Sequence, residues 1–264
     1  PAPLGGGAVA RVRKATEAIA TALDTLGLLN VQLAVTNVDG EGQSDVYGLE
    51  ANPRSSRTVP FVSKATGVPI AKLAARVMAG ETRDAVDVDE QIPEDVSVKE
   101  VVLPFDRVPG SDPRLGPEMK STGEVMGTAG SFAKAYDKAQ DAVGKPIPAS
   151  GTAWIDLSAD EFPDRDTDAG EALLDGYAEH FDLATFDATD ELVAALREGR
   201  IDLVVSRDRD PLETCVQEEI TYFSTAASAK AALEAIGSKG ESIDVEAISD
   251  RPRRTGRWGA SGDD

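Results

Sequence analysis

Polar and apolar residues alternate along residues 30–52, and this pattern predicts two β-strands joined by a loop. Apolar side chains recur at every second position between residues 31 and 35, and a period of two returns between residues 46 and 52. Successive side chains of a strand point to opposite faces. Glu50 and Asn52 should therefore project from one face, and Gln32 can lie beside them if the strands pair. Pro53 ends the second strand, because proline cannot donate to a ladder.

Helical spacing of apolar residues predicts further elements in the first half of the chain. We expect helices over residues 9–26, with Gly27 at the C-cap, and over residues 69–78. A strand is expected over 97–105, and a helix over 131–142 with Ser131 as its N-cap. Turn residues dominate 110–116, and Gly123 and Gly127 bracket a turn that leads into another strand.

Residues 141–150 are rich in proline and glycine and predict a domain boundary. Beyond them strands and helices alternate, which predicts a parallel sheet flanked by helices. The expected strands are 153–157, 183–186, 201–206 and 220–223, and the expected helices are 169–178, 190–197 and 225–236. Residues 251–264 should be loose, because the segment is polar and contains glycine.

The composition narrows the possible partners. The 264 residues carry a formal net charge of −20, which argues against a nucleic-acid backbone as a partner. No apolar run is long enough for a membrane span, and no signal segment opens the chain. The single cysteine, Cys215, fits a reducing cytoplasm. The acidic excess indicates either an ordinary acidic protein or adaptation to a salt-rich cytoplasm, and we favour the halophilic interpretation.

The end of the predicted hairpin gathers candidate chemistry. Glu50 supplies a carboxylate, Gln32 and Asn52 supply amide oxygens, and Arg54 and Arg57 follow within one turn. Magnesium takes oxygen ligands and only one or two protein carboxylates, and guanidinium groups bind phosphate in a forked geometry. The set favours phosphoryl transfer from a magnesium nucleotide. The alternative is a strand end with solvated polar residues and a surface Arg–Glu pair.

Two long stretches have a distinctive sequence: EANPRSSRTVPFVSKATGVPIAKLAARVMAG, residues 50–80, and SVKEVVLPFDRVPGSDPRLGPEMKSTGEVMG, residues 97–127. Both resemble the second ATP-grasp unit of the carbamoyl phosphate synthetase large subunit. The resemblance is strong from residue 30 to about 140 and weaker beyond. It implies an α/β chain with an ATP-grasp C-terminal lobe at 1–142, a linker at 143–150, a methylglyoxal-synthase-like regulatory domain at 151–249 and a flexible tail at 250–264.

The same resemblance implies a ligase that makes carbamoyl phosphate from bicarbonate, glutamine-derived ammonia and two MgATP, for pyrimidine and arginine synthesis. Glu50, Gln32 and Asn52 would bind Mg2+ or Mn2+, with Gln32 and Glu50 contacting the nucleotide. Arg54 and Arg57 would be catalytic and hold carbamate and the transferring phosphoryl group. The implied partners are a glutaminase small subunit and the N-terminal part of the large subunit, which this segment lacks, so we expect the segment alone to be inactive.

The C-terminal resemblance lies in GRIDLVVSRDRD and EEITYFSTAASAKAALEAI, residues 199–210 and 218–236. The family domain binds nucleotide or ornithine effectors. Here Ser206, Arg207 and Asp208 replace the usual Asn-Thr-Thr, and Ser224-Thr225 replaces Thr-Thr, so we expect weakened or altered effector binding. The only histidine, His180, ends a predicted helix, which does not favour methylglyoxal synthase activity.

Two alternative functions remain open at this point. One is another ATP-grasp ligase, such as a biotin-dependent carboxylase. The sequence motif NPRSSRTVPFVSKATG and the α/β domain that follows argue against it. The other is a non-catalytic module for regulation or assembly, because the segment lacks most of the nucleotide pocket.

Overall fold

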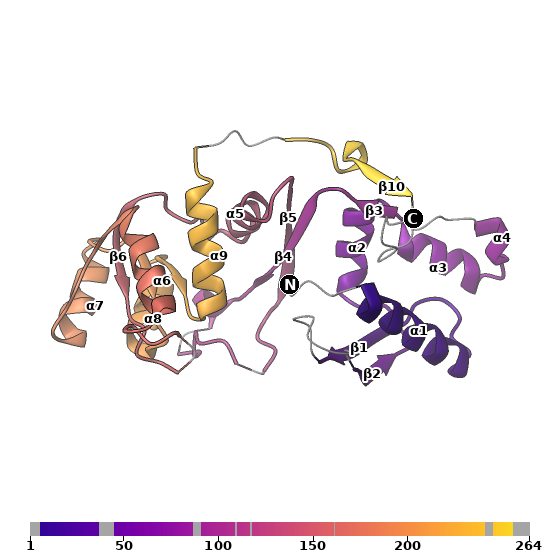
Figure 1. Ribbon diagram of the computed structural model, residues 1–264, viewed down its shortest axis with the longest axis horizontal. Helices are drawn as coiled ribbons and strands as arrows, with labels where there is room; N and C mark the ends of the chain where they lie inside the picture. The colour runs from indigo at the N-terminus through magenta and orange to yellow at the C-terminus, as the bar shows by residue number, and fades with distance from the viewer. Residues whose placement is uncertain are drawn as a thin grey trace. The chain divides into compact units, whose positions relative to one another are not determined.

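The structure is a computed structural model that describes residues 6–36, 45–86, 91–108, 110–116, 118–160, 162–240 and 245–255. The chain forms two compact units, Pro1–Glu94 with Glu246–Asp264, and Asp95–Val245. Figure 1 labels their helices and strands. The glycine-rich lead before residue 6, the loop inside the hairpin and the tail after residue 255 lie outside the described residues.

The first unit is built on the predicted hairpin. Strands β1 (Asn30–Val35) and β2 (Val46–Asn52) pair antiparallel, and helix α1 (Gly6–Ala22) packs against both. Helices α2 (Thr58–Thr66), α3 (Ile70–Met78) and α4 (Arg83–Val86) follow, with α3 packed against both of the others. Pro53 does follow the last residue of β2, as predicted.

Helix α1 begins and ends nearer the N-terminus than predicted. It ends at Ala22 rather than near residue 26, and Asp24 adopts a φ of 47° in the left-handed region. That conformation ends the helical ladder, since non-glycine residues adopt it mainly in turns. Gly27, with a φ of 104°, therefore lies in the following turn and is not a helix cap.

Two further elements of the first unit differ from the sequence prediction. Helix α2 occupies residues for which the sequence predicted no element. Strand β10 (Arg253–Thr255) pairs antiparallel with β3 (Gln91–Pro93), and the 3₁₀-helix η2 (Ile248–Asp250) precedes it. The prediction of a loose C-terminal segment is thus wrong for 253–255, because their backbone groups bond to a strand 160 residues away, a pairing that local composition does not reveal.

The second unit begins with an antiparallel pair covered by a helix. Strands β4 (Val96–Val102) and β5 (Gly123–Ala129) pair along their full lengths, and α5 (Phe132–Val143) packs on both. Ser131 caps α5 as predicted, since its side chain accepts a hydrogen bond from the Lys134 amide. The strand predicted to reach residue 105 ends at Val102, and Phe105–Arg107 form the 3₁₀-helix η1. Gly123 and Gly127 lie within β5 itself.

The rest of this unit is the predicted parallel sheet flanked by helices, except that the strand predicted over 183–186 lies at Phe181–Leu183. Parallel strands β6 (Gly151–Ile155), β7 (Phe181–Leu183), β8 (Leu203–Val205) and β9 (Thr221–Phe223) have the order β7-β6-β8-β9. Four helices accompany them, α6 (Asp168–Ala178), α7 (Thr189–Arg197), α8 (Arg209–Gln217) and α9 (Ala226–Gly237). Buried side chains form two clusters, one including α6 and α9 and the other including α7 and α8. The chain is therefore α/β, as predicted.

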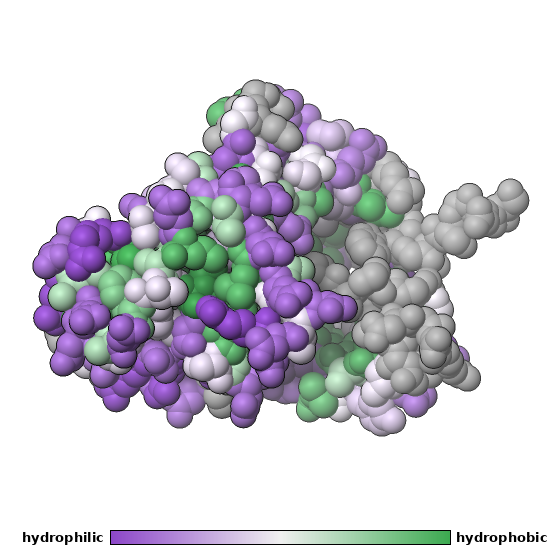
Figure 2. Space-filling model, turned by 60° about the vertical axis from the view of Figure 1, so that its left-hand side comes forward, coloured by the Kyte–Doolittle hydropathy of each residue, from purple (hydrophilic) through white to green (hydrophobic). Residues whose placement is uncertain are grey.

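The predicted linker lies inside the second compact unit. Residues 145–150 connect α5 to β6 without helix or strand, but α5 packs against α9, so the units divide at Glu94 and Asp95. The domain boundary at 143–150 stays a prediction. Within the described residues, no helix has the length and apolarity that crossing a membrane requires. In Figure 2 most of the coloured surface is hydrophilic, and apolar residues gather near the middle of the view.

Candidate functional site

The register of the hairpin brings three of the predicted site residues to one place. Gln32 lies directly opposite Glu50, and Asn30 lies opposite Asn52. The register shifts after Gln32, because Leu33 lies opposite Gly48 and Leu49 is skipped. Residues opposite each other in an antiparallel pair share a face. The side chains of Gln32, Glu50 and Asn52 therefore project from the same face, at the end of the hairpin that leads into Pro53.

The three side chains differ in exposure and are linked by a hydrogen bond. Gln32 and Glu50 are exposed, while Asn52 is half-buried. The Asn52 side-chain amide nitrogen donates to the Glu50 carboxylate. This contact uses the amide nitrogen, so the Asn52 amide oxygen is still available as an acceptor or ligand. One carboxylate and two amide oxygens thus lie together at the surface.

The two arginines follow on the turn between β2 and α2. The Arg54 amide donates to the Asn52 carbonyl at 2.8 Å, and the Arg54 guanidinium donates to the Ser55 carbonyl at 3.0 Å. Arg57 directly precedes α2, and both side chains are exposed. The turn therefore places two guanidinium groups within a few residues of Asn52.

Asn30 is a residue of this face that the sequence reasoning missed. Its side-chain amide lies 3.4 Å from the Ser56 hydroxyl, which ties the start of β1 to the arginine-bearing turn. Extending the period of two by one more step, from Gln32 back to Asn30, would have found it. This contact helps to fix the turn relative to the hairpin.

The donor set fits a magnesium ion better than a transition metal. Among the described residues no cluster of three or more His, Cys, Asp or Glu side chains exists that could hold a metal. The hairpin instead offers oxygen ligands with a single carboxylate, Glu50. Magnesium typically takes one or two carboxylates and completes its octahedron with water and substrate phosphate.

A second candidate region lies at the carboxyl ends of β6, β8 and β9, where the resemblance predicts an effector site. Asp156 accepts hydrogen bonds from the Ser158 and Ser206 hydroxyls, at 3.0 and 3.3 Å. Burial, followed by the neighbouring Asp156 and Asp210 carboxylates, raises the pKa of Asp208. Carboxylates therefore dominate this edge and repel anions.

The arginines and hydroxyls of this edge are engaged with the protein itself. Arg207 donates to the Ser224 and Leu115 carbonyls at 3.5 and 3.2 Å. Arg209 forms an ion pair with Glu213 at 2.5 Å and donates to the Gly110 carbonyl. Thr225 caps α9 by accepting from the Ser228 amide. Phosphate would have to displace these contacts to use either arginine.

The chain is similar to one described protein family and to several individual proteins. Residues 4–86, which contain the whole hairpin, match the family described as "Carbamoyl-phosphate synthase L chain, ATP binding domain". The chain is 54% identical over 260 residues to the carbamoyl phosphate synthase large chain of Halobacterium salinarum, a match that covers 98% of the chain. The chain belongs to the family of carbamoyl phosphate synthase large chains.

The chain is much shorter than most of these relatives. It covers 23% of the Halobacterium salinarum protein and 26% of the large chain of Methanosarcina acetivorans, to which it is 37% identical over 285 residues. A shorter large chain from Methanosarcina barkeri is 38% identical over 269 residues, and the match covers 66% of it. The chain therefore spans about a quarter of the length of the relatives that it matches first.

Proposed function

We propose that this chain forms part of a carbamoyl phosphate synthase large chain and that its hairpin holds the metal and phosphate side of the carbamate-phosphorylating site. The whole enzyme would make carbamoyl phosphate from bicarbonate, glutamine-derived ammonia and two MgATP. The observation that supports the proposal most is the register of the hairpin, which sets Gln32 opposite Glu50 with Asn52 bonded to the same carboxylate. The match of residues 4–86 to an ATP binding domain supports it independently.

The proposed roles follow from the charges of the side chains. The Glu50 carboxylate and the amide oxygens of Gln32 and Asn52 would hold Mg2+, or Mn2+, which neutralises charge on the nucleotide phosphates when bound. Arg54 and Arg57 would hold the carbamate and the oxygens of the transferring phosphoryl group, since a guanidinium matches either anion in a forked geometry. Catalysis of this kind depends mainly on positioning and on electrostatic stabilisation.

The partners of the chain are part of the same proposal. A glutaminase small subunit would supply ammonia, and the rest of the large chain would complete the nucleotide pocket. The parallel-sheet domain would have a regulatory role with weakened binding of nucleotide or ornithine effectors. The carboxylates at Asp156 and Asp208, and the engagement of Arg207 and Arg209 with neighbouring groups, support weak binding of anionic effectors.

The test is Glu50→Gln in a full-length large chain that contains this segment, assayed with its small subunit. The substitution keeps the size of the side chain and removes the charge that binds the ion. We expect carbamoyl phosphate synthesis to fall at least 100-fold, on the order of the effects seen when one electrostatic group of an active site is removed. ATP turnover that depends on bicarbonate alone should persist, because it belongs to the first phosphorylation.

Asp45→Asn is the matched control. Asp45 is an exposed carboxylate next to the start of β2, outside the proposed site. This variant should retain synthesis within about twofold, since exposed charges away from a site contribute little. Normal synthesis by the Glu50→Gln enzyme would refute the assignment.

A further inference from the structure

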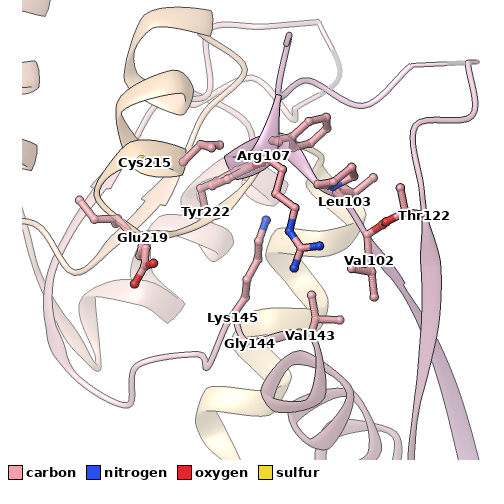
Figure 3. Close-up of a pocket in the computed structure, with 14 residues that line it drawn as sticks. Val102, Leu103, Arg107, Thr122, Val143, Gly144, Lys145, Cys215, Glu219 and Tyr222 are labelled. Atoms are coloured by element: carbon pink, nitrogen blue, oxygen red, sulfur yellow. The ribbon is translucent and has the colours of Figure 1, made fainter. Parts of the chain in front are cut away.

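The second unit contains a cavity of about 300 Å³, and two cationic side chains point into it. Figure 3 shows them as Arg107 and Lys145. The Lys145 ammonium lies 4.5 Å from the centre of the Tyr222 ring and attracts the Glu100 carboxylate. Arg107 also interacts within the protein. Both cations therefore have partners in the chain itself, and the cavity defines no ligand.

The C-terminal strap, residues 248–255, packs on the first unit beside α2. Its strand β10 pairs with β3, and β3 packs against α2 (Figure 1). Two further contacts hold the strap to β3 and the residue after it. The Glu94 amide donates to the Pro252 carbonyl at 3.2 Å, and the Gln91 side-chain amide donates to the Thr255 hydroxyl at 3.4 Å. The strap is thus joined to α2 through β3.

The side chain of Arg253 lies directly over Gly67, the C-cap residue of α2. A Cβ at Gly67 would lie 2.8 Å from both Cζ and Nε of Arg253, so the guanidinium rests against the glycine backbone. Gly67 has a φ of 75°, and its amide donates to the Ser63 carbonyl at 2.9 Å, which ends the helix. Glycine supplies both the left-handed conformation and the room for the guanidinium.

Backbone carbonyls of the strap fix the orientation of the Arg253 guanidinium. It donates to the carbonyls of Ile248, Ser249 and Arg251, the last two at 3.3 and 3.2 Å. Its Nε has no hydrogen-bond partner among the described residues and lies over Gly67. Because the group is planar and its donors form a rigid fork, three bonds to carbonyls hold its plane in place. A positive charge is thereby fixed beside the C-terminus of α2, where the helix dipole favours a cation.

The opposite end of α2 carries the arginines proposed to hold carbamate. Arg57 directly precedes the helix, and Arg54 lies in the turn before it. The helix has nine residues and is therefore about 14 Å long. No residue of α2 is fully buried, so the contacts at its ends contribute much of what fixes its position.

We propose that Arg253 is a positioning residue for the phosphoryl-transfer site. By fixing the C-terminal end of α2, it sets where Arg54 and Arg57 lie at the other end. It acts through the helix and not on the substrate. This role rests on the proposed function of Arg54 and Arg57 and extends the site to a strap near the C-terminal end of the described chain.

The test is Arg253→Ala in a full-length large chain that contains this segment, assayed for ATP formation from carbamoyl phosphate and MgADP. The KM for carbamoyl phosphate should rise and its kcat/KM should fall about tenfold or more, because a displacement of about 1 Å caused far from the chemistry can cost about 100-fold. The KM for MgADP should stay within about twofold, because the proposed metal ligands lie on the hairpin. A merely structural role would lower only the amount of active enzyme and leave both KM values unchanged, and that result would overturn the proposal.

Two further variants show which conclusion fails if the result is negative. Arg200→Ala removes an exposed arginine that pairs with Glu198 in the second unit, and this control should leave both KM values unchanged. Arg57→Ala should raise the KM for carbamoyl phosphate. An unchanged KM in Arg57→Ala would contradict the proposed function itself. A raised KM in Arg57→Ala with an unchanged KM in Arg253→Ala would overturn only the role of Arg253.

Gly67→Ala tests the contact between Arg253 and the end of α2. The added Cβ collides with the guanidinium, and this collision is absent in Arg253→Ala. Gly67→Ala should therefore lower kcat/KM for carbamoyl phosphate about tenfold in the wild type but less than about twofold further in Arg253→Ala, and fully additive effects would overturn the proposal. Melting curves show which variants fold. Arg253→Lys, which lacks the planar group, replaces Arg253→Ala if the latter does not fold, and a wild-type KM for carbamoyl phosphate in the folded variant would equally overturn the proposal.

Discussion

At the residue scale, Glu100 shows how a single carboxylate of β4 is held inside the second unit. Its carboxylate accepts hydrogen bonds from the Val101 amide at 3.0 Å and from the Gln140 side chain at 3.1 Å. Burial nevertheless raises the pKa of Glu100, because it outweighs these bonds and the attraction of Lys145. The charged form is therefore less favoured in the folded protein than in the unfolded chain.

Glu100→Gln tests this balance, because the substitution should change how the free energy of unfolding depends on pH. A carboxyl group whose pKa is raised on folding binds more protons in the native state, so its contribution to stability falls as pH rises through the ordinary value toward the raised one. The free energy of unfolding of the wild type should therefore drop relative to that of Glu100→Gln between about pH 4.5 and neutral pH. Denaturant unfolding at several pH values measures the difference.

Glu234 lies on the exposed surface of α9. Glu234→Gln is therefore the control, because it removes the charge of a carboxylate that is not buried. A difference between wild type and Glu100→Gln that stays constant with pH would contradict the proposed balance.

The candidate site was predictable at this scale because it depends on local spacing. A period of two sets Glu50 and Asn52 on one face, and Pro53 fixes where the strand ends, so pairing alone brings Gln32 alongside. The buried hydroxyl of Tyr222, which has no hydrogen-bond partner among the described residues, could not be found in this way. A tyrosine within an apolar run looks like an ordinary core residue.

At the element scale, Gly127 allows α5 to pack closely on β5. A Cβ at this position would lie 2.0 Å from the Ala135 carbonyl oxygen and 2.6 Å from the Ala139 amide nitrogen. Both atoms belong to the backbone of α5 and cannot move away as a flexible side chain could. The glycine is therefore required by the close approach of strand and helix.

Gly127→Ala should destabilise the second unit by about 1–3 kcal/mol, as expected for overpacking of a close interface. Gly130→Ala is the control, because a Cβ there meets no atom within 4 Å. It should change the free energy of unfolding by less than about 0.5 kcal/mol. Denaturant unfolding measures both, and equal effects of the two substitutions would mean that α5 does not approach β5 closely in solution.

Elements with strong local patterns were predicted and those fixed by distant partners were not. The periodicity of α5 and its N-cap Ser131 gave a helix that the structure contains. Helix α8 was missed because its sequence, RDPLETCVQ, begins with charges and a proline, a pattern that also suits a turn. Strands β3 and β10 were missed because each has three residues and exists only through pairing with the other.

At the scale of the whole molecule, the net charge of −20 sets how the protein responds to salt. The chain has 47 acidic residues against 27 lysines and arginines, so like charges repel over the whole surface. Salt shortens the range of this repulsion to about 3 Å at 1 M. Exposed ion pairs such as Arg200–Glu198 cannot compensate, since pairs of this kind contribute about 0–1 kcal/mol.

The halophilic hypothesis predicts a marked dependence of stability on potassium chloride. The melting temperature should rise between 0.1 M and 2 M KCl, because screening removes repulsion from the compact state. Differential scanning calorimetry measures this, and the same series with sucrose separates screening from a general effect of excluded solutes. Equal melting temperatures at low and high KCl would refute the hypothesis.

We propose that the hairpin of β1 and β2 acts in the second of two phosphorylations. The most direct measurement is the reverse of that step, the formation of ATP from carbamoyl phosphate and MgADP by the full-length large chain. Glu50→Gln should lower this rate at least 100-fold, while bicarbonate-dependent ATP hydrolysis and the rate of the Asp45→Asn enzyme stay close to normal. ATP formation at the wild-type rate by Glu50→Gln would contradict the claim.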